Sequence, residues 1–383
     1  MILVLADDFS GAAEMAGMAH RHGLHTRVCT RSMAFSSADL VAIDTQTRTA
    51  GPEQASKRVH QALLQMRSPD VRWVFKKVDS VLRGFVREEL ESLCAAQGLE
   101  RALLLPANPS KQRTLRKGQY WLADQPLHQT HFASDPHFPR LTSQVEGLLA
   151  QQGKLPIRVI NHITELGSRG IFIPNIERLD QVRLWANEAP ADCLLSGGVD
   201  FFRSLLNAKG HPEKTDVPTV HDRRQVRSRL FVCGSPGALA AGRMAWCKEK
   251  AIPIHQCDPA WFADEPLAIP ETWLRAMHED LQNHGTSLLA TCASPLSKHL
   301  DPRQITERLV QIVEIILARN PVDQLLVEGG ETSLVLARAL GWDALEVIHA
   351  SGEGIAELMP HGGGPPTLIS KPGSYPWSDE WLV

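Results

Sequence analysis

Charged and hydroxyl side chains crowd the run from Lys76 to Gly84, whose sequence is KKVDSVLRG. The run follows Trp73 to Phe75, which has the composition of a buried strand, and precedes a helical pattern that starts near Phe85. In a parallel α/β sheet this junction is the carboxyl end of a strand, where ligands bind. Polar groups buried there need partners, so the run predicts either a polar ligand site or a network of salt bridges.

Each residue type in this run suits a particular task. Arg83 offers a planar fork that can bind a carboxylate or a phosphate through two parallel hydrogen bonds. Asp79 could orient Arg83 or accept a proton. Lys76 and Lys77 alternate around the strand end, so only one of them is expected to face a ligand.

A second polar junction follows the first apolar run of the chain, Ile2 to Leu5. Asp7 and Asp8 stand at its carboxyl end, and Ser10 opens a helical pattern whose backbone N–H groups point back to the same place. The pair of aspartates favours hydroxyl recognition, with one carboxylate serving as general base. The simpler interpretation makes Asp8 or Ser10 a helix N-cap.

Taken together, the two junctions describe a pocket for a small polyhydroxylated acid. In this assignment Arg83 binds the carboxylate and Asp8 binds hydroxyls.

The second half of the chain contains glycine-rich turns between strand and helix patterns. FVCGSPGALAAGR spans Phe231 to Arg243, and VEGGETS spans Val327 to Ser333. Both present backbone amides at a helix N-terminus, the arrangement that cradles phosphate oxygens. Neither matches the P-loop or the GxGxxG pattern. With Gly352 and Gly354 nearby, the turns predict a nucleotide-phosphate site.

The metal ligands of such a site stay unassigned by the sequence. Glu331 could hold Mg²⁺ through water or could be a solvated acid in the first turn of a helix. His128, His131 and His137 have loose spacing and favour loop hydrogen bonds over metal binding.

Near-continuous apolar strands alternate with amphipathic helices along most of the chain, which predicts parallel sheets covered on both faces. At 383 residues the chain is too long for one typical core. The polar, proline-containing stretch Lys209 to Arg229 marks the expected boundary. We therefore predict an α/β protein with two domains, 1–222 and 229–383, each with a mainly parallel sheet flanked by helices. Pro106 to Arg140 lacks periodicity and is expected to be a long functional loop.

The bulk composition excludes several classes of protein. Forty basic against 43 acidic residues give a net charge of −3, which does not favour nucleic-acid or membrane-surface binding. The seven cysteines are scattered without a CxxC pair, which is typical of a reducing compartment. Because the first residues lack the pattern of a signal peptide and no apolar run is long enough for a membrane span, a cytoplasmic location is expected.

The motifs resemble those of the four-carbon acid sugar kinases. DDFSGA at Asp7 to Ala12 is similar to the family's DDFTGA-type motif, and Lys77 to Gly84 is similar to its K-x-DS-x-LRG motif. The segment from Pro106 to Pro136 resembles the family's PA-P to DP segment. In the second half, the matches are the Gly234-Ser235 turn, GGETS at Gly329 to Ser333, and LxxKPG at Leu368 to Gly373.

The resemblance implies an N-terminal substrate domain, a C-terminal ATP domain and transfer of phosphate from ATP to the terminal hydroxyl of a tetronate-type acid at a cleft between them. It implies Mg²⁺ as a cofactor, a sugar acid and ATP as partners, and a homodimer is also considered. Residues implied to contact the acid are Asp8, Lys77, Asp79, Ser80 and Arg83, beside Asp7 and Ser10 from the residues themselves. Residues implied to contact ATP are Ser235, Gly329, Gly330, Glu331, Thr332, Gly352, Gly354 and Gly373.

Three positions depart from the family pattern. Glu14 replaces a common Asp, Val81 a common Thr and Phe85 a common Asn. Val81 and Phe85 lie beside the substrate motif, so they leave the identity of the acid undecided. They also keep a non-catalytic protein that only senses a sugar acid as the main alternative. A nicotinamide-dependent dehydrogenase is the weaker rival, because GxGxxG and its following acid are absent from the sequence.

Overall fold

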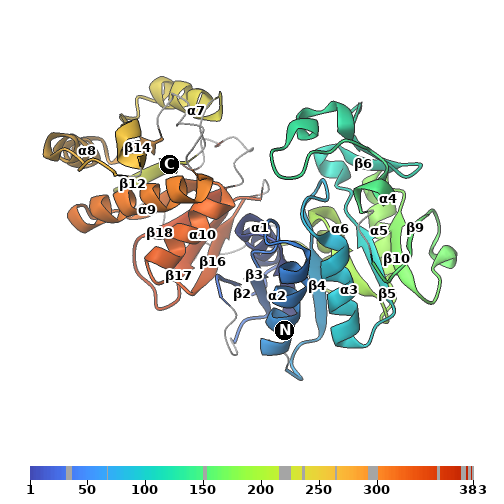
Figure 1. The fold of residues 1–383 in the computed structure, drawn as a ribbon. Helices are drawn as coiled ribbons and strands as arrows, with labels where there is room; N and C mark the ends of the chain where they lie inside the picture. The colour runs from blue at the N-terminus through green and yellow to red at the C-terminus, as the bar shows by residue number, and fades with distance from the viewer. Residues whose placement is uncertain are drawn as a thin grey trace. The chain divides into compact units, whose positions relative to one another are not determined.

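The computed structural model describes the chain outside residues 32–36, 67, 150–152, 215–225, 235–237, 264, 292–300, 352–353, 372–376, 378–380 and 382–383, and gives only the backbone of 238–241. The chain forms two compact units, Met1–Val217 and Pro218–Val383 (Figure 1). Each is described by itself. The predicted domain limits at residues 222 and 229 stay a proposal.

Unit 1 contains one parallel sheet in the order β2-β3-β1-β4-β11-β5-β10-β9. Its strands are β1 (Ile2–Ala6), β2 (Thr26–Cys29), β3 (Leu40–Asp44), β4 (Trp73–Lys77), β5 (Arg101–Leu105), β9 (Ile157–Ile160), β10 (Gly170–Pro174) and β11 (Leu194–Gly197). Its helices are α1 (Phe9–Arg21), α2 (Pro52–Gln65), α3 (Val86–Gln97), α4 (Val145–Leu148), α5 (Leu179–Asn187) and α6 (Val199–Ala208).

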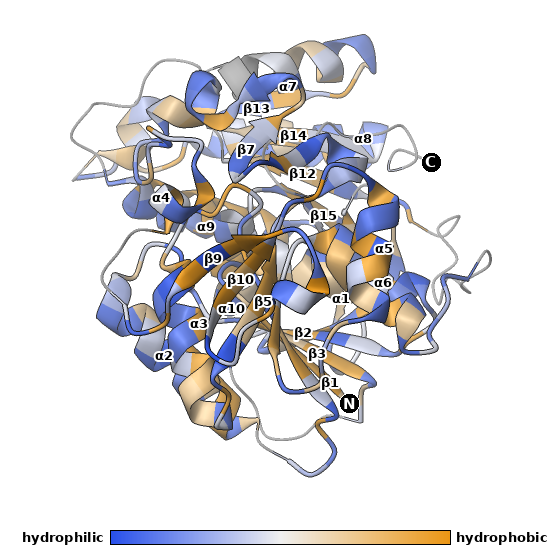
Figure 2. Cartoon of the chain, turned by 90° about the vertical axis from the view of Figure 1, so that its right-hand side faces the viewer, coloured by the Kyte–Doolittle hydropathy of each residue, from blue (hydrophilic) through white to orange (hydrophobic). Residues whose placement is uncertain are grey.

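The strand order creates a switch point at β1. The chain leaves β1 towards β2 on one side, whereas it passes from β3 through α2 to β4 on the other side. Right-handed crossovers in opposite directions place the helices on opposite faces. Accordingly, α1 packs against α6, and α2 packs against α3 (Figures 1 and 2). Loops that diverge at such a point open the crevice in which α/β sheets bind ligands.

The segment expected to be one long irregular loop instead carries a small antiparallel sheet, so that expectation was wrong in part. β6 (Arg113–Arg116), β7 (Gln119–Leu122) and β8 (Gln125–Pro126) pair in this order. Lys117 and Gly118 both have positive φ, 49° and 74°, as a tight hairpin turn requires. The strands are two to four residues long, which is too short for alternation to show in the sequence.

Unit 2 has a sheet in the order β13-β14-β12-β15-β18-β17-β16. It is parallel from β13 to β18, and β17 pairs antiparallel with both β16 and β18. Its strands are β12 (Arg229–Cys233), β13 (Ile254–Gln256), β14 (Thr286–Ala290), β15 (Gln324–Glu328), β16 (Ala344–Ala350), β17 (Ala356–Pro360) and β18 (Thr367–Lys371). Its helices are α7 (Ala238–Glu249), α8 (Glu271–His284), α9 (Pro302–Arg319) and α10 (Gly330–Ala339). The predicted fold class is confirmed.

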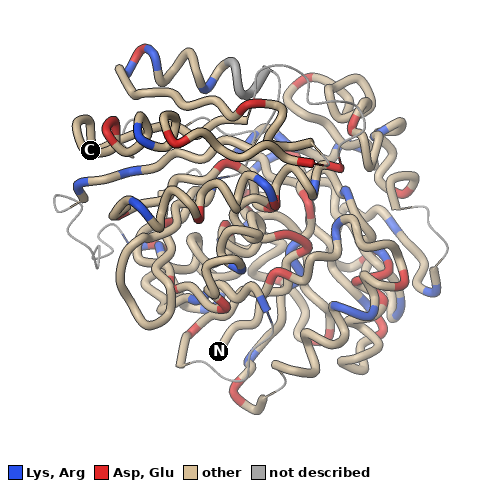
Figure 3. Tube along the Cα trace, turned by 60° about the vertical axis from the view of Figure 1, so that its left-hand side comes forward, with Lys and Arg blue, Asp and Glu red and all other residues tan. Residues whose placement is uncertain are grey.

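Burial follows the strands. In unit 1, all five residues of each of β1, β3 and β10 are buried, and Figure 2 shows apolar strands between helices of mixed polarity. In unit 2, Trp377 and Trp381 join the core around Phe231. The six described cysteines are buried. Acidic and basic residues are interspersed along the chain (Figure 3). None of the helices that the structure describes is long and apolar enough to cross a membrane.

A close approach between β11 and β5 makes Gly197 a sensitive position. A Cβ at Gly197 would lie 2.1 Å from the carbonyl oxygen of Leu105, a backbone atom that cannot turn away. We expect Gly197→Ala to lower the free energy of unfolding by about 2 kcal/mol or more, because the two strands must separate. Urea unfolding of the full chain measures the loss.

Gly210→Ala is the matched control. Gly210 has φ +87° and open space around it, so its alanine variant carries a backbone cost of about 1 kcal/mol without a clash. Equal losses in the two variants would contradict the steric explanation.

Candidate functional site

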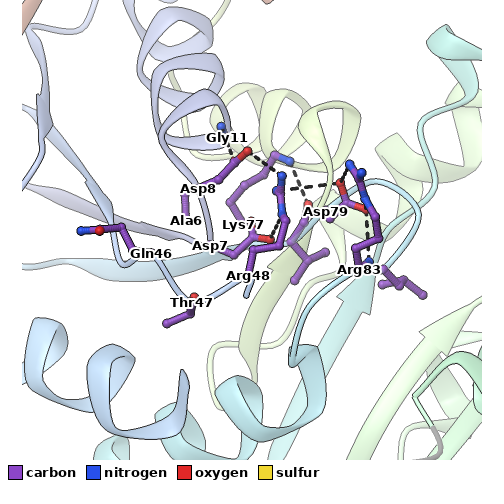
Figure 4. Close-up of polar contacts among 12 residues, drawn as sticks. Ala6, Asp7, Asp8, Gly11, Gln46, Thr47, Arg48, Lys77, Asp79 and Arg83 are labelled. Atoms are coloured by element: carbon purple, nitrogen blue, oxygen red, sulfur yellow. Dashed lines mark hydrogen bonds and ion pairs between the residues drawn. The ribbon is translucent and has the colours of Figure 1, made fainter. Parts of the chain in front are cut away.

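Three strand ends of unit 1 meet at the switch point. Ala6 at the end of β1 lies beside Asp44 of β3 and Lys77 of β4 in the sheet register. The segments that leave these strands therefore start at the same level. They bring Asp7 and Asp8 and the segments after β3 and β4 into one cluster (Figure 4).

Arg48 occupies the centre of this cluster. Its Nε donates to Asp7 Oδ2 at 2.7 Å and its Nη1 donates to Asp8 Oδ2 at 2.6 Å. Its Nη2 lies 3.8 Å from Asp79 Oδ1. Burial raises the pKa of Asp7, but the charges of Arg48 and Lys76 outweigh burial and lower it overall. Arg48 was missed by the sequence analysis, although the polar run that follows the strand Leu40 to Ile43 could have indicated it.

Asp79 and Arg83 form a closed pair. Asp79 Oδ1 accepts from Arg83 Nη2 at 2.8 Å, and Asp79 Oδ2 accepts from Arg83 Nε at 3.0 Å. Backbone N–H groups of Val81 and Arg83 also donate to Asp79 Oδ2. Burial opposes ionisation, yet Arg83 and Arg48 hold the pKa of Asp79 well below its usual range. Arg83 Nη1 donates to Asp135 Oδ2 at 3.0 Å, so this guanidinium is already bound to two carboxylates.

Asp8 is the most accessible carboxylate around Arg48. Its side chain is 24% exposed, against 3% for Asp7 and 6% for Asp79. Asp8 Oδ1 accepts from the backbone N–H of Gly11 at 2.8 Å, which confirms the N-cap interpretation for this residue. A Cβ on Gly11 would lie 2.8 Å from Asp8 Oδ1 and 3.3 Å from Lys77 Cγ, so the start of α1 lies close to both Asp8 and Lys77 (Figure 4).

The two lysines at the end of β4 take opposite sides, as the alternation of a strand requires. Lys76 is fully buried, and its Nζ lies 3.0 Å from Glu89 Oε1. Thr47, the neighbour of Arg48, donates a short hydrogen bond to the same Glu89 oxygen. Lys77 lies on the Asp8 side, where its Nζ is 3.5 Å from Glu14 Oε2.

The remaining predicted residues of unit 1 lie around this cluster. Ser10 is in the first turn of α1, and Ser80 Oγ accepts from Arg113 Nη1. Val81 is fully buried, and Phe85 packs edge-on against Phe138 at 5.7 Å between ring centroids.

The three loop histidines are not brought together as a metal site. The described residues contain no group of three or more His, Cys, Asp or Glu that could hold a metal ion. His128 Nδ1 instead lies 2.8 Å from Ser143 Oγ, and the ring of His131 stacks near Phe132.

In unit 2 the structure brings two of the predicted glycine turns together. Gly234 follows β12, and a Cβ on it would lie 2.9 Å from Thr332 Oγ1 in the first turn of α10. Gly329 lies between β15 and α10, Gly330 is the first residue of α10, and Glu331 is exposed in the first turn of this helix. Gly354 lies between β16 and β17. The predicted residues Ser235, Gly352 and Gly373 lie outside the described residues.

A buried carboxylate, that of Glu328, contacts residues near these strand ends in unit 2. Glu328, the last residue of β15, accepts from Trp377 Nε1 at 2.8 Å and forms an ion pair with Arg243. Its Oε1 also lies 3.8 Å from Lys371 Nζ at the end of β18. Burial lowers the pKa of Lys371 to about 8.

The cluster around Arg48 predicts a pH-dependent stability. Asp7 and Asp79 have folded-state pKa values below the ordinary 3.8, so their contribution is fully present above pH 3.8 and is lost as the pH falls through the folded values. Arg48→Gln leaves buried carboxylates without their counterion and should lower the free energy of unfolding by about 3 kcal/mol at pH 7. The variant carboxylates then bind protons more readily, so the deficit should narrow as the pH is lowered from 7 towards 4. Urea unfolding at several pH values measures it.

The control for this series is Arg178→Gln, which breaks an exposed pair with Asp180 at 2.8 Å. This change should alter stability by no more than about 0.5 kcal/mol at any of these pH values. A deficit of Arg48→Gln that stays constant with pH would contradict the electrostatic account.

Both units match known domain families. Residues 2–181 match the family described as "Sugar-binding N-terminal domain", and residues 230–375 match "Nucleotide-binding C-terminal domain". Two crystal structures share the fold. One from Salmonella typhimurium LT2 has a TM-score of 0.78 at 18% identity, covering 98% of this chain and 96% of that one. One from Haemophilus influenzae has a TM-score of 0.73 at 16% identity, covering 98% and 97%.

Curated relatives cover nearly the whole chain. A 3-oxo-tetronate kinase from Pseudomonas fluorescens is 25% identical over 407 residues, which is 97% of this chain and 93% of that protein. A D-threonate kinase from Salmonella typhimurium is 30% identical over 379 residues, which is 90% of this chain and 88% of that protein. With both domain families matched in order, the chain belongs to the family of four-carbon acid sugar kinases.

Proposed function

We propose that this protein is an ATP-dependent kinase that phosphorylates the terminal hydroxyl of a four-carbon sugar acid. The named relatives are kinases of 3-oxo-tetronate and D-threonate, and the chain matches both of their domain types. The proposed acceptor is therefore an acid with a short polyhydroxylated chain.

The observation that carries the proposal is the charge pattern around Asp8. Arg48 contacts Asp7, Asp8 and Asp79, but Asp79 is also paired with Arg83 and Asp7 is almost fully buried, so Asp8 is the partly exposed carboxylate of this cluster. Carboxylates accept hydrogen bonds from hydroxyl groups. A partly exposed carboxylate at the end of a strand suits a ligand with hydroxyl groups better than it suits a second anion.

Asp8 is the proposed general base. Asp79 has both oxygens bonded to Arg83, and Asp7 is almost fully buried. Asp8 keeps the most exposed carboxylate of the three, and its position is fixed by Gly11 and Arg48. A base must be held within hydrogen-bond reach of the proton that it removes, and Asp8 meets the requirements of access and fixed geometry.

Unit 2 is proposed to bind the nucleotide. The backbone amides at Gly330 open α10, and the Gly234 turn lies beside Thr332. Amides at a helix N-terminus bind phosphate oxygens without needing a side-chain charge. Mg²⁺ is proposed as the partner of these phosphates, with Glu331 as a ligand through water. When bound, the ion would neutralise charge on the phosphates.

The test of the function is ADP release from MgATP with a panel of acids. The panel contains the four stereoisomers of 2,3,4-trihydroxybutanoate and their 3-oxo forms. We expect one or more of these acids to give turnover that requires both MgATP and the full-length chain. A melting temperature raised by an acid without ADP formation would favour the non-catalytic sensor instead.

The role of Asp8 has a separate test. Asp8→Asn keeps the size of the side chain but removes the proton acceptor, so kcat should fall about 100-fold or more. Asp124→Asn, at an exposed turn of the small sheet, should leave kcat unchanged. A fall in kcat of less than threefold for Asp8→Asn, with the melting temperature preserved, would remove Asp8 from the role of base.

A further inference from the structure

A second group of charges lies near Asp8 and contains more cations than carboxylates. We define the cation corner as Lys77, Lys111 and Arg113 together with Glu14. Lys111 Nζ lies 2.8 Å from Glu14 Oε1, and Lys77 Nζ lies 3.5 Å from Glu14 Oε2. Burial raises the pKa of Glu14, but Lys111, Lys77 and Arg113 outweigh burial and lower it. One carboxylate is therefore surrounded by three cations.

Arg113 differs from the other guanidiniums of the site. Arg48 and Arg83 each bind carboxylates, and Arg140 donates to the carbonyl oxygens of Leu82 and Phe138. Among the residues that the structure describes, no carboxylate forms an ion pair with Arg113. Its Nη1 donates to the neutral hydroxyl of Ser80, and its Nε is buried without a hydrogen-bond partner.

The surroundings of Arg113 make this imbalance costly. Lys77 is 6% exposed and Glu14 is 12% exposed, so water screens the corner only in part. A partly buried cation without an anionic partner is unfavourable unless a ligand supplies the charge. A guanidinium with a free Nε and a neutral partner on Nη1 retains the donors that a planar carboxylate can accept in pairs.

The position of the corner indicates which anion it takes. Lys77 lies close to Gly11, whose N–H donates to Asp8, and Ser80 directly follows Asp79. All members of the corner lie within residues 2–181, the part that matches the sugar-binding domain family. An acceptor with hydroxyls on Asp8 would thus place an anionic end towards Arg113 without leaving this unit.

We propose that Arg113, supported by Lys77 and Lys111, binds the carboxylate of the sugar acid. This inference rests on the proposed function for the identity of the ligand. It gives the anchoring task to a residue of the small sheet and leaves Arg83 to hold Asp79 and Asp135. Glu14 acts as a positioning residue, since it keeps the ammonium groups of the two lysines beside Arg113.

Binding measurements test the proposal without depending on turnover. Isothermal titration of the full chain would use the four stereoisomeric trihydroxybutanoates, their neutral primary amides and inorganic phosphate. For the acid that binds the wild type, Arg113→Gln should weaken binding about 30-fold or more. The corresponding amide should bind the wild type weakly and the variant equally weakly. Arg113→Lys restores the charge without the fork and should recover part of the affinity.

Arg116→Gln is the matched control on the same strand. Arg116 lies three residues further along β6 and forms a half-exposed pair with Glu177 at 3.6 Å. Its replacement should leave acid binding within twofold of wild type. Circular dichroism and melting temperature check that all three variants are folded.

Several outcomes would overturn the proposal. These are acid binding by Arg113→Gln within threefold of wild type, equal losses for acid and amide, or a loss confined to inorganic phosphate. Acid binding by the wild type that depends on Arg113 without ADP formation would reject the kinase proposal and keep this one. A wild type that binds none of the acids would reject both.

Discussion

The placement of Arg48 among Asp7, Asp8 and Asp79 is the interaction on which the site depends. These side chains come from the ends of β1, β3 and β4, and a single guanidinium links them. Carboxylates so close together in a buried position would repel one another without that counterion. The guanidinium therefore stabilises the unit and holds the side chain of Asp8 in place.

A buried cation next to this cluster is also compensated by a carboxylate. Lys76 is fully buried and compensated by Glu89, whose other contact is Thr47, the neighbour of Arg48. Because Thr47 bonds to Glu89 and directly precedes Arg48, a shift of the Lys76–Glu89 pair would move the backbone next to Arg48. In unit 2, Glu328 has a comparable place below the glycine turns, where it joins the ends of β15 and β18 and the residue Trp377. Each unit thus has an ion pair with a buried carboxylate, Lys76–Glu89 or Arg243–Glu328, next to the strand ends that are proposed to bind a ligand.

Charge is divided within the proposed acid site. Around Arg48, Asp8 is a partly exposed carboxylate, whereas Glu14 is a carboxylate that lies among three cations. A sugar acid has the matching division, because its hydroxyls donate to carboxylates and its own carboxylate needs a cation. Glu14 forms ion pairs with both Lys77 and Lys111. The departure from the family pattern with the clearest structural consequence is therefore Glu14, since Val81 is buried and Phe85 packs on Phe138.

The amino-acid sequence by itself determined the alternation of strands and helices, the mainly parallel sheets and the two polar junctions after β1 and β4. These features are local, because hydrophobic periodicity and a polar residue at a strand end can be seen within about ten residues. The sequence could not determine that Arg48 links the junctions or that Arg113 reaches Ser80. Those contacts join residues far apart in the chain, and they exist because the strand order brings β3, β1 and β4 together and the small sheet carries Arg113 to Ser80. The tertiary structure decided which charges are paired, since ion pairing depends on distances that sequence spacing does not encode.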